Sequence, residues 1–476
     1  MVKDSIFKEL EDILGQGLET REIEVAEYAI DGLVPAAVAI PETVEQVAEV
    51  VRVASSNNLA LVVRGGGTKI EMGNRPERLD LVLATSRINR ITDMDTANLT
   101  VTAQAGVVFA DLQDALSGQE NRCYMPVSSS GPSDEQVCSD RQHMGCFVPL
   151  DPPFSDRATL GGIVAANSSG PRRLLYGTMR DMLLGVRYVN ADGRIIGMGG
   201  KTVKNVSGYD VSKLLIGSMG SLGVICEMTL RLLPLPEHSA TTIVGFKSLE
   251  LAFSMVDKIM ASNLIPAALE VLDARVGDKM GVVEAGTGRG YYVAVLAEGA
   301  REVVKRISLD VKQMCTGMGG EVTAYLEGEK NADFWKDYGN MAKPAATEAQ
   351  GAVVARLSCP IARLKELMKQ AVQRARQLNM EGQLLAHAGS GFGRMVLYGA
   401  GGGGGFEDRL LRWVEDMLEA STSVGGNMVI ERAGNPLKSS LPMWGAQRGD
   451  FDILRKVKKA IDPKRIFSPG RFVAGI

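Results

Sequence analysis

Apolar residues recur at two spacings along the first part of the chain, and the spacings predict alternating strands and helices. In residues 4–15 they lie three and four positions apart, which places them on one face of a helix. Residues 37–68, AVAIPETVEQVAEVVRVASSNNLALVVRGGGT, have the pattern of a strand, a helix, a strand and a glycine loop. Thr43 and Gln46 form a capping-box pattern at the start of this helix. The order predicts a βαβ-like unit.

The alternation continues to the C-terminus, with a change of character near residue 235. Strands are predicted at residues 79–85, 90–95, 99–106, 184–190 and 223–234. Helices are predicted at residues 109–116, 249–262 and 300–318. The segment LPLPEHS is typical of a linker, and an amphipathic helix ended by Pro463 precedes an extended tail. We predict an α/β protein with domains at residues 1–235 and 236–425, and with residues 426–476 packing back on the first domain.

Composition narrows the class of protein. A chain of 476 residues with 45% apolar residues can bury two sizeable cores. A net charge of −3 without a basic patch excludes nucleic acid as an expected partner. No apolar run reaches the roughly 20 residues of a membrane span, and the N-terminus lacks the pattern of a signal peptide. We therefore expect a cytoplasmic protein that reaches the inner face of the membrane only through partner subunits.

The glycine loop LVVRGGGTKIEMG exposes bare backbone directly after a predicted strand. Gly65, Gly66 and Gly67 allow backbone N–H groups to approach a pyrophosphate closely. Thr68 adds a hydroxyl donor, and Arg64 adds charge or supports the loop. A tight turn without a ligand is the alternative. The loop is not a nicotinamide fingerprint, because no GxGxxG opens a helix here.

Two more glycine-rich stretches follow in the same half of the chain. They are PLDPPFSDRATLGGIVAANSSGPRRLLYGTMRDMLLGVRYVNADG (149–193) and KNVSGYDVSKLLIGSMGSLGVICEMTLRLLPLP (204–236). Together with RGGGTK, and with AHAGSG (386–391) and IDPKRIFSPGRF (461–472), they resemble FAD-binding proteins of the vanillyl-alcohol-oxidase type. Within that type the chain is similar to the FAD-binding subunits of bacterial glycolate oxidase and to FAD-linked D-lactate dehydrogenases. The resemblance implies an FAD-binding domain of two α/β subdomains and an α/β cap domain.

The resemblance also assigns residues to the cofactor. The first cluster would cradle the pyrophosphate, the second would run towards the flavin ring, and the third would lie by the adenine and ribose. The residues so assigned are Arg64, Gly65, Gly66, Gly67, Thr68, Pro149, Asp151, Pro152, Thr159, Gly161, Gly162, Asn167, Ser168, Gly220, Gly223, Val224 and Ile225. Members that bind flavin covalently often carry histidine at the position of Thr68, so we predict non-covalent FAD.

The cap departs from the pattern of its relatives. Related D-2-hydroxy-acid dehydrogenases carry HxGDGNxH and a later EHG, which together build a metal and substrate site. This chain has HAGSGFGR (387–394) and IERAG (430–434), so Arg394 and Arg432 replace two histidines. A guanidinium has no lone pair for a cation, and we expect the metal site to be absent. Either the two arginines clamp a substrate carboxylate while His387 takes the hydroxyl proton, or they pair with Glu431 and His387 is structural.

A segment before PLDPP gathers possible metal ligands. Cys123, Cys138, His143 and Cys146 lie in residues 121–153, and they form a thiolate and imidazole set suited to zinc or an iron–sulfur cluster. Chance occurrence in a long loop is the alternative.

The resemblance predicts an activity. We expect FAD-dependent oxidation of a small 2-hydroxy acid, such as glycolate or D-lactate, by hydride transfer. Electrons would leave through a paralogous flavin subunit or an iron–sulfur subunit. The alternative is a catalytically silent flavin subunit that relays electrons or supports assembly of a multi-subunit 2-hydroxy-acid dehydrogenase.

Overall fold

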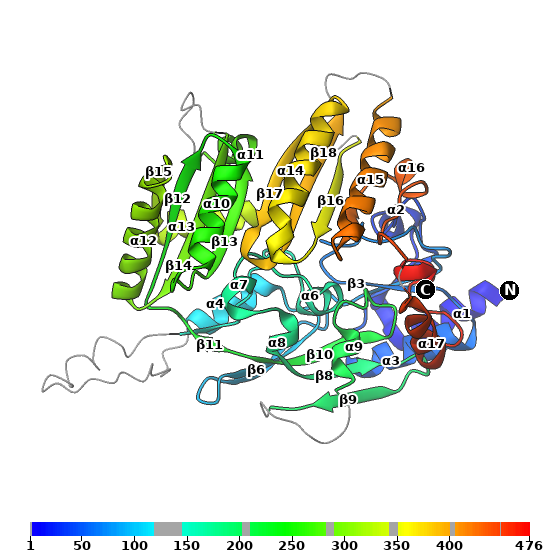
Figure 1. Cartoon of the computed structure of the whole chain (residues 1–476). Coiled ribbons are helices and arrows are strands. Elements are labelled where there is room, and N and C mark those ends of the chain that lie inside the picture. The colour runs from blue at the N-terminus through cyan, green and yellow to red at the C-terminus, as the bar shows by residue number, and fades with distance from the viewer. Residues whose placement is uncertain are drawn as a thin grey trace, which may run out of the picture.

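The computed structural model of the chain is a mixed α/β molecule with a larger sheet above two smaller ones (Figure 1). It describes residues 2–118, 145–201, 210–281, 290–341, 351–399, 405–447 and 449–476. The three main sheets contain four, five and eight of the described strands, and two further strands form a small sheet of their own. Among these residues, no helix combines the length and the apolar character that crossing a membrane requires.

The first sheet carries the glycine loop. Its strands, in spatial order, are β1 (Leu18–Glu19), β2 (Ala37–Ala39), β4 (Leu81–Ala84) and β3 (Leu61–Arg64). β2 and β3 both run parallel to β4, which lies between them, so the βαβ-like unit has an inserted strand. Helix α3 (Val44–Ser56) begins as predicted, since Thr43 Oγ1 accepts the N–H of Gln46 at 3.1 Å.

The second sheet is antiparallel and shares a core with the first. Its strands are β5 (Ile91–Asp95), β6 (Thr100–Gln104), β10 (Val224–Arg231), β8 (Leu183–Val189) and β9 (Ile195–Gly199). Apolar residues of both sheets form one buried cluster with α3, α4 (Phe109–Ser117) and α6 (Leu160–Ala166). The short elements around this core are α1 (Val2–Leu14), η1 (Gly15–Gly17), α2 (Glu22–Ala26), β7 (Cys146–Phe147), α7 (Arg173–Tyr176), α8 (Met179–Met182), α9 (Ser212–Leu215) and β11 (Leu233–Pro234).

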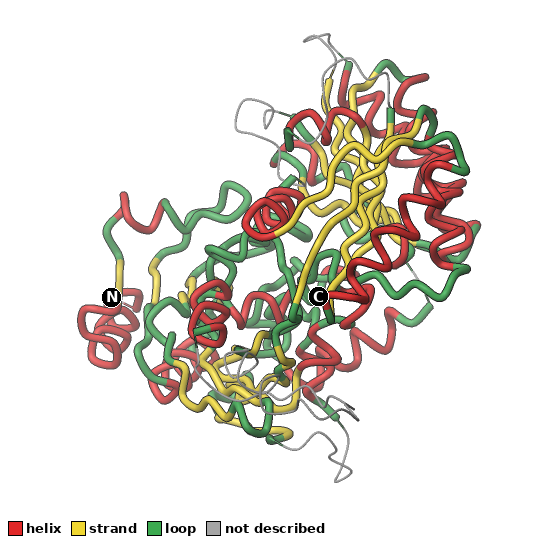
Figure 2. Tube along the Cα trace, turned by 90° about the vertical axis from the view of Figure 1, so that its left-hand side faces the viewer, coloured by secondary structure: helices red, strands yellow, loops and turns green. Residues whose placement is uncertain are grey.

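The third sheet forms the cap. Its strands are β15 (Glu321–Glu327), β12 (His238–Phe246), β14 (Tyr291–Gly299), β13 (Ala268–Asp273), β17 (Met380–His387), β18 (Phe392–Gly399), β16 (Val353–Ser358) and β19 (Asn427–Arg432). Helices line one face of this sheet (Figure 2). They are α10 (Leu249–Met260), α12 (Arg301–Thr316), α14 (Ile361–Gln377) and α15 (Phe406–Ser423). Residues of α11 (Ala274–Lys279) and α13 (Gly328–Asn340) belong to a separate apolar cluster, which also receives Tyr176 from the first domain.

Strands lie across two of the segment boundaries that the sequence suggested. The expected linker LPLPEHS is partly strand, because β11 pairs with β7 and β12 begins at His238. The predicted third segment starts at residue 426, but β19 belongs to the cap sheet, and Leu437, Leu441 and Met443 still pack in the cap core. α16 (Asn435–Lys438), α17 (Phe451–Ile461) and η4 (Val473–Gly475) follow.

The C-terminal tail packs against the first sheet. Leu61 N–H donates to the carbonyl of Ile466 at 2.7 Å, and Ser468 N–H donates to the carbonyl of Leu61 at 2.9 Å. The tail therefore runs parallel to β3, just before the glycine loop. Segments from the two ends of the chain thus meet where the loop begins.

Candidate functional site

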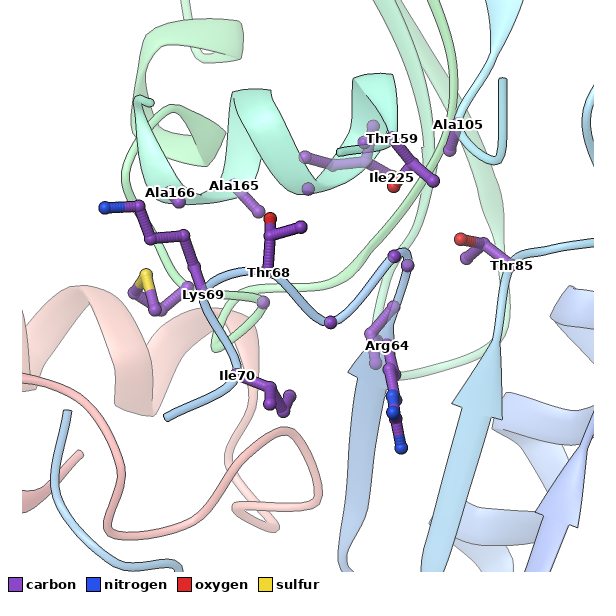
Figure 3. A pocket seen from close by; sticks show the side chains of 18 of the residues that line it. Arg64, Thr68, Lys69, Ile70, Thr85, Ala105, Thr159, Ala165, Ala166 and Ile225 are labelled. Carbon is purple, nitrogen blue, oxygen red and sulfur yellow. The ribbon is translucent and has the colours of Figure 1, made fainter. Parts of the chain in front are cut away.

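A first cavity lies where the glycine loop faces α6 (Figure 3). Eleven predicted cofactor residues line it: Arg64, Gly65, Gly66, Gly67, Thr68, Thr159, Gly161, Gly162, Gly220, Gly223 and Ile225. Residues from three glycine-rich clusters, more than a hundred positions apart at the extremes, therefore meet around one cavity.

Six predicted cofactor residues do not line this cavity: Pro149, Asp151, Pro152, Asn167, Ser168 and Val224. Val224 is fully buried in β10, and Asn167 ends α6 in the left-handed conformation with a φ of 46°. Asp151 and Pro152 line a separate cavity between α4 and α13. The prediction for these residues thus rests on the resemblance alone.

The glycines of the loop are required by packing as well as by access. A Cβ on Gly66 would lie 1.7 Å from the carbonyl oxygen of Arg157. A Cβ on Gly65 would lie 2.1 Å from Oγ1 of Thr159. Both distances are far below van der Waals contact, so the segment that leads into α6 can approach the loop only because side chains are absent. Ligand access was the reason inferred from the sequence, and close backbone packing is a second one.

Arg64 points away from the other side chains of the loop. Its Nη1 donates to the carbonyl of Glu27 at 2.8 Å, and the guanidinium lies over the ring of Tyr28 at 4.7 Å. In Figure 3 it extends to the side opposite Thr68 and Lys69. Of the two roles predicted for Arg64, the geometry favours support of the loop.

Two residues of the C-terminal region were not assigned from the sequence. Arg471 lines the cavity, and it holds the loop by donating to the carbonyls of Ile70 and Met72. Burial lowers the pKa of Arg471 to about 10, against the opposing effect of Asp31. Its motif, SPGRF, was visible in the sequence, but the spacing does not reveal which side chain reaches the loop.

Lys458 ties the tail to the third glycine cluster. This buried side chain donates to the carbonyls of Ser221 at 2.7 Å and Phe467 at 2.8 Å, and to Oδ2 of Asp462 at 2.6 Å. Ser221 directly follows Gly220 of the cavity wall. Lys458 therefore fixes the turn that carries Gly220.

The cavity fits a polar, anionic dinucleotide. Oγ1 of Thr159 and Nε of Arg471 are buried at its wall, and neither has a partner among the described residues. An unsatisfied buried polar group costs about 1–3 kcal/mol, which a bound ligand would remove by hydrogen bonding. The guanidinium of Arg471 also favours negative charge in the cavity.

A second cavity joins the first to the cap. The two share Gly67, Thr68 and Lys69. The other lining residues come from the loop after Lys69, from the segment before α6 and from the cap strands: Glu71, Met72, Pro153, Phe154, Val354, Arg394, Glu431 and Arg432. A small ligand there would lie between the FAD domain and the cap sheet.

His387 is buried behind Arg394, which lines this cavity, and both of its ring nitrogens are engaged. Nη1 of Arg394 lies 2.8 Å from Nε2, and Oε1 of Glu270 lies 2.9 Å from Nδ1. Because a guanidinium only donates, Nε2 is the acceptor and Nδ1 carries the proton. Burial and the neighbouring Arg394 hold the pKa of His387 well below its usual value. The imidazole is therefore neutral, and its acceptor lone pair is occupied.

The two predicted arginines have different partners. Nε of Arg394 donates to Oε2 of Glu431 at 2.7 Å, and Nη1 of Arg356 lies 3.5 Å from Oε1. Burial opposes ionisation of Glu431, but Arg394, with Lys69 and Arg356, holds the pKa of this carboxyl well below its usual range. Arg432 instead pairs with Glu71 at 2.8 Å. Its Nη1 is buried and has no partner among the described residues.

The cysteine-rich segment gives no metal site in the part of the chain that the structure describes. Cys123, Cys138 and His143 lie outside the described residues. Cys146 is fully buried in β7. No group of three or more His, Cys, Asp or Glu side chains among the described residues could hold a metal ion. Zinc or an iron–sulfur cluster therefore stays a prediction without support.

The fold and the cavity define a flavin-dependent oxidoreductase, and comparisons with known proteins specify the family. The FAD binding domain model matches residues 35–134 and 129–199, and the model for the C-terminal domain of FAD linked oxidases matches residues 235–472. The chain belongs to the FAD-linked oxidases. The predicted resemblance is thereby confirmed.

Curated relatives match almost from end to end. The glycolate oxidase subunit GlcD of Bacillus subtilis is 27% identical over 459 residues, which cover 92% of this chain and 89% of that protein. A D-lactate dehydrogenase of Archaeoglobus fulgidus is 28% identical over 446 residues, which cover 91% and 90%.

Solved structures confirm the predicted fold type. An alkyldihydroxyacetonephosphate synthase matches with a TM-score of 0.70 at 18% identity, over 98% of this chain and 86% of that chain. A p-cresol methylhydroxylase matches with a TM-score of 0.69 at 14% identity, over 98% and 96%. At these identities the likeness concerns the fold.

Proposed function

We propose that this chain oxidises a small 2-hydroxy acid, of the size of glycolate or D-lactate, with FAD held non-covalently in the first cavity, at the glycine loop. The relatives that match almost end to end are a glycolate oxidase subunit and a D-lactate dehydrogenase. FAD, when bound, supplies the acceptor for a hydride. The cavity between Thr68 and the cap would receive the acid next to the flavin.

The observation that carries this proposal is the state of Arg432. This residue lines the second cavity, its Nε is held by Glu71, and its buried Nη1 lacks a partner. A carboxylate is the group that a guanidinium fork recognises best. Arg432 therefore binds the substrate carboxylate, while Arg394, engaged by Glu431 and His387, positions the cap strands around it.

A second candidate function has its own support. His387, the predicted base, has its acceptor lone pair occupied by Arg394. A subunit without a base at that position would accept electrons from a partner flavin or iron–sulfur subunit and relay them. The electron-relay function is thus supported by the same residues, His387, Arg394 and Glu431, that the dehydrogenase function uses for positioning.

One anaerobic experiment separates the two functions. The purified chain with FAD is mixed with glycolate, D-lactate and longer 2-hydroxy acids while the flavin absorbance is followed. Rapid bleaching supports the dehydrogenase. A flavin that stays oxidised with every acid, yet bleaches with dithionite, refutes it and supports the relay.

The mode of cofactor attachment has a separate test. Acid precipitation should leave the yellow colour in the supernatant, because Thr68 offers no imidazole for a covalent bond to the flavin. Colour retained in the pellet would contradict non-covalent binding.

A further inference from the structure

We propose that Lys69 is the group that accepts the hydroxyl proton of the substrate. This inference rests on the proposed 2-hydroxy-acid dehydrogenase function and adds a catalytic residue to it. Lys69 is not among the residues that the sequence predicts to act on the substrate.

The position of Lys69 is the first reason. Lys69 follows Thr68 in the glycine loop. It lines both the first cavity, at the glycine loop, and the second cavity, which reaches the cap. In Figure 3 its side chain rises from the loop on the side away from Arg64, and its nitrogen lies beyond Ala166 at the end of α6. A substrate placed between the flavin and the cap therefore lies within reach of a group that both cavities share.

The freedom of Lys69 is the second reason. Its Nζ has no hydrogen bond or ion pair to any residue within the described ranges, although the side chain is half-buried. The other ionic side chains of the second cavity are held in pairs: Glu71 with Arg432, and Glu431 with Arg394. A base needs an available lone pair, and a half-buried amine without a partner can provide one.

The charges around Lys69 favour the neutral amine. Burial lowers the pKa of Lys69, Glu431 opposes this, and Arg394 and Arg356 lower the pKa further. The charged groups of the two cavity walls come from β3, β18, β19, the loop itself and the C-terminal tail: Arg64, Arg394, Glu431, Arg432, Glu71 and Arg471. The charges that act on Lys69 are Glu431, Arg394 and Arg356 of β16, so two guanidinium cations outnumber one carboxylate and disfavour a further positive charge.

The alternatives in the cap are less suited to the task. Nε2 of His387 accepts from Arg394, so protonation of His387 would require that bond to break next to a cation. The pKa of Glu431 lies well below its usual range, because Arg394 and its other cationic neighbours outweigh the effect of burial. Such a carboxylate is too weak a base for a hydroxyl proton near neutral pH.

The proton and the two electrons removed from the substrate each have an acceptor in this proposal. The substrate O–H bond breaks as Lys69 Nζ takes the proton, and the electron pair of that bond forms the carbonyl. The Cα–H bond would break with it, and FAD, when bound, would supply the acceptor for that hydrogen and its two electrons. The 2-hydroxy acid becomes a 2-oxo acid, the flavin is reduced by two electrons, and Lys69 ends as an ammonium that releases its proton to solvent.

The test compares Lys69→Met, Lys69→Arg and the wild type in anaerobic stopped-flow reduction by glycolate or D-lactate. Loss of a general base slows the step by about 10²- to 10⁴-fold. We expect both variants to lose reduction to this extent, because arginine keeps the charge but cannot accept a proton. The wild-type rate should fall about tenfold per pH unit below the pKa of Lys69. Lys305→Met, in the exposed part of α12, is the matched control.

A second readout does not depend on turnover. Trinitrobenzenesulfonate labelling of Lys69, followed by peptide mass spectrometry across pH, reports its titration directly. Labelling should reach half its maximum rate at a lower pH than a lysine in an unstructured peptide. Reduction rates are taken per bound FAD, because Lys69 lines the FAD cavity, and reduction by dithionite should match the wild type in both Lys69 variants.

Each contrary outcome has one meaning. Reduction of Lys69→Arg at the wild-type rate, or a wild-type rate that falls as pH rises, would show that Lys69 acts as a cation and overturns the inference. Labelling like that of the free peptide overturns it as well. If no 2-hydroxy acid reduces the wild type, the proposed function itself fails, and the inference fails with it.

Discussion

Replacement of Lys458 by methionine tests how far the C-terminal tail holds the cofactor site together. The side chain is 2% exposed, and its ammonium donates to Asp462 and to the carbonyls of Ser221 and Phe467. Methionine keeps most of the volume but removes the charge and all three donors. Asp462, which is 0% exposed, would keep its N–H donors from Ile466 and Phe467 but lose its counter-ion.

The expected loss of stability is large. Removing one partner of a buried ion pair costs about 3–5 kcal/mol, because the remaining charge stays buried without compensation. Domains are stable by about 5–15 kcal/mol, so Lys458→Met should remove a substantial fraction of the stability of the first domain. Lys458→Met/Asp462→Asn should recover part of the loss, since the uncompensated charge is then gone.

The same variant should weaken FAD binding. Ser221 follows Gly220, which lines the cavity, and the freed turn must be ordered again when FAD binds. Each 1.4 kcal/mol of this coupling raises the Kd tenfold, and we expect at least a rise of about tenfold. Urea unfolding of the apoprotein followed by circular dichroism gives the stability, and titration of flavin fluorescence gives the Kd.

Lys459→Met is the control, because Lys459 is exposed on the same helix. The reasoning is refuted if Lys458→Met unfolds within about 0.5 kcal/mol of the wild type, the range of surface substitutions. It is also refuted if the stability falls while the Kd for FAD stays unchanged, since the tail would then stabilise the fold without ordering the turn.

Three further substitutions probe single groups. Thr159→Val removes a buried hydroxyl without a partner, so the apoprotein should be as stable or about 1 kcal/mol more stable, while the Kd for FAD rises about tenfold in fluorescence titration. Arg394→Met should cost about 3–5 kcal/mol in urea unfolding at pH 7, and Arg394→Met/Glu431→Gln should recover part of it. Because the pKa of Glu431 is held low, the stability from this pair is present above the usual carboxyl pKa, and it should be lost as pH falls through the lowered value. Burial raises the pKa of Asp151 to about 7, so stability should fall as pH rises from the usual aspartate pKa to about 7, and Asp151→Asn should flatten that part of the urea-midpoint profile. Equal profiles for wild type and Asp151→Asn would contradict the assignment.

Local signals in the sequence predicted much of the fold. The cap at Thr43 and the apolar spacing after it place α3 correctly, and the structure has α3 at Val44–Ser56. Pro463 marks the end of the last long helix, and α17 ends at Ile461. These signals succeed because caps, prolines and periodicity act within one or two turns of the residue that carries them.

The glycine clusters were also recognisable, but their geometry was not. The sequence did not reveal that Gly66 must admit the carbonyl of Arg157, or that Asp151 lies beside a different cavity. Lys458 and Ser221 are 237 positions apart, and no local pattern connects them. Contacts of this range depend on how whole segments pack, which periodicity does not specify.

The pairing of Arg432 shows the same limit at short range. The sequence suggested Glu431 as a possible ion-pair partner of both Arg394 and Arg432. Arg432 is the next residue after Glu431 in the chain. A register shift in β19 leaves Glu431 without a Cα partner on β16, so the two neighbours do not alternate regularly, and both line the second cavity. Arg394 comes from another strand and reaches Glu431, whereas Arg432 crosses to Glu71 of the glycine loop.

Under the proposed function, the first domain rather than the cap supplies the group that accepts the proton. Arg394 and Glu431 neutralise each other within the cap, and Arg432 is tied to the FAD domain through Glu71. The cap cluster is left with binding and positioning roles. The loop after β3 provides Lys69, an amine without a partner among the described residues, at the junction of the two cavities. It follows that substitutions in the cap cluster should change stability and substrate affinity, while substitutions at Lys69 should change the rate of flavin reduction.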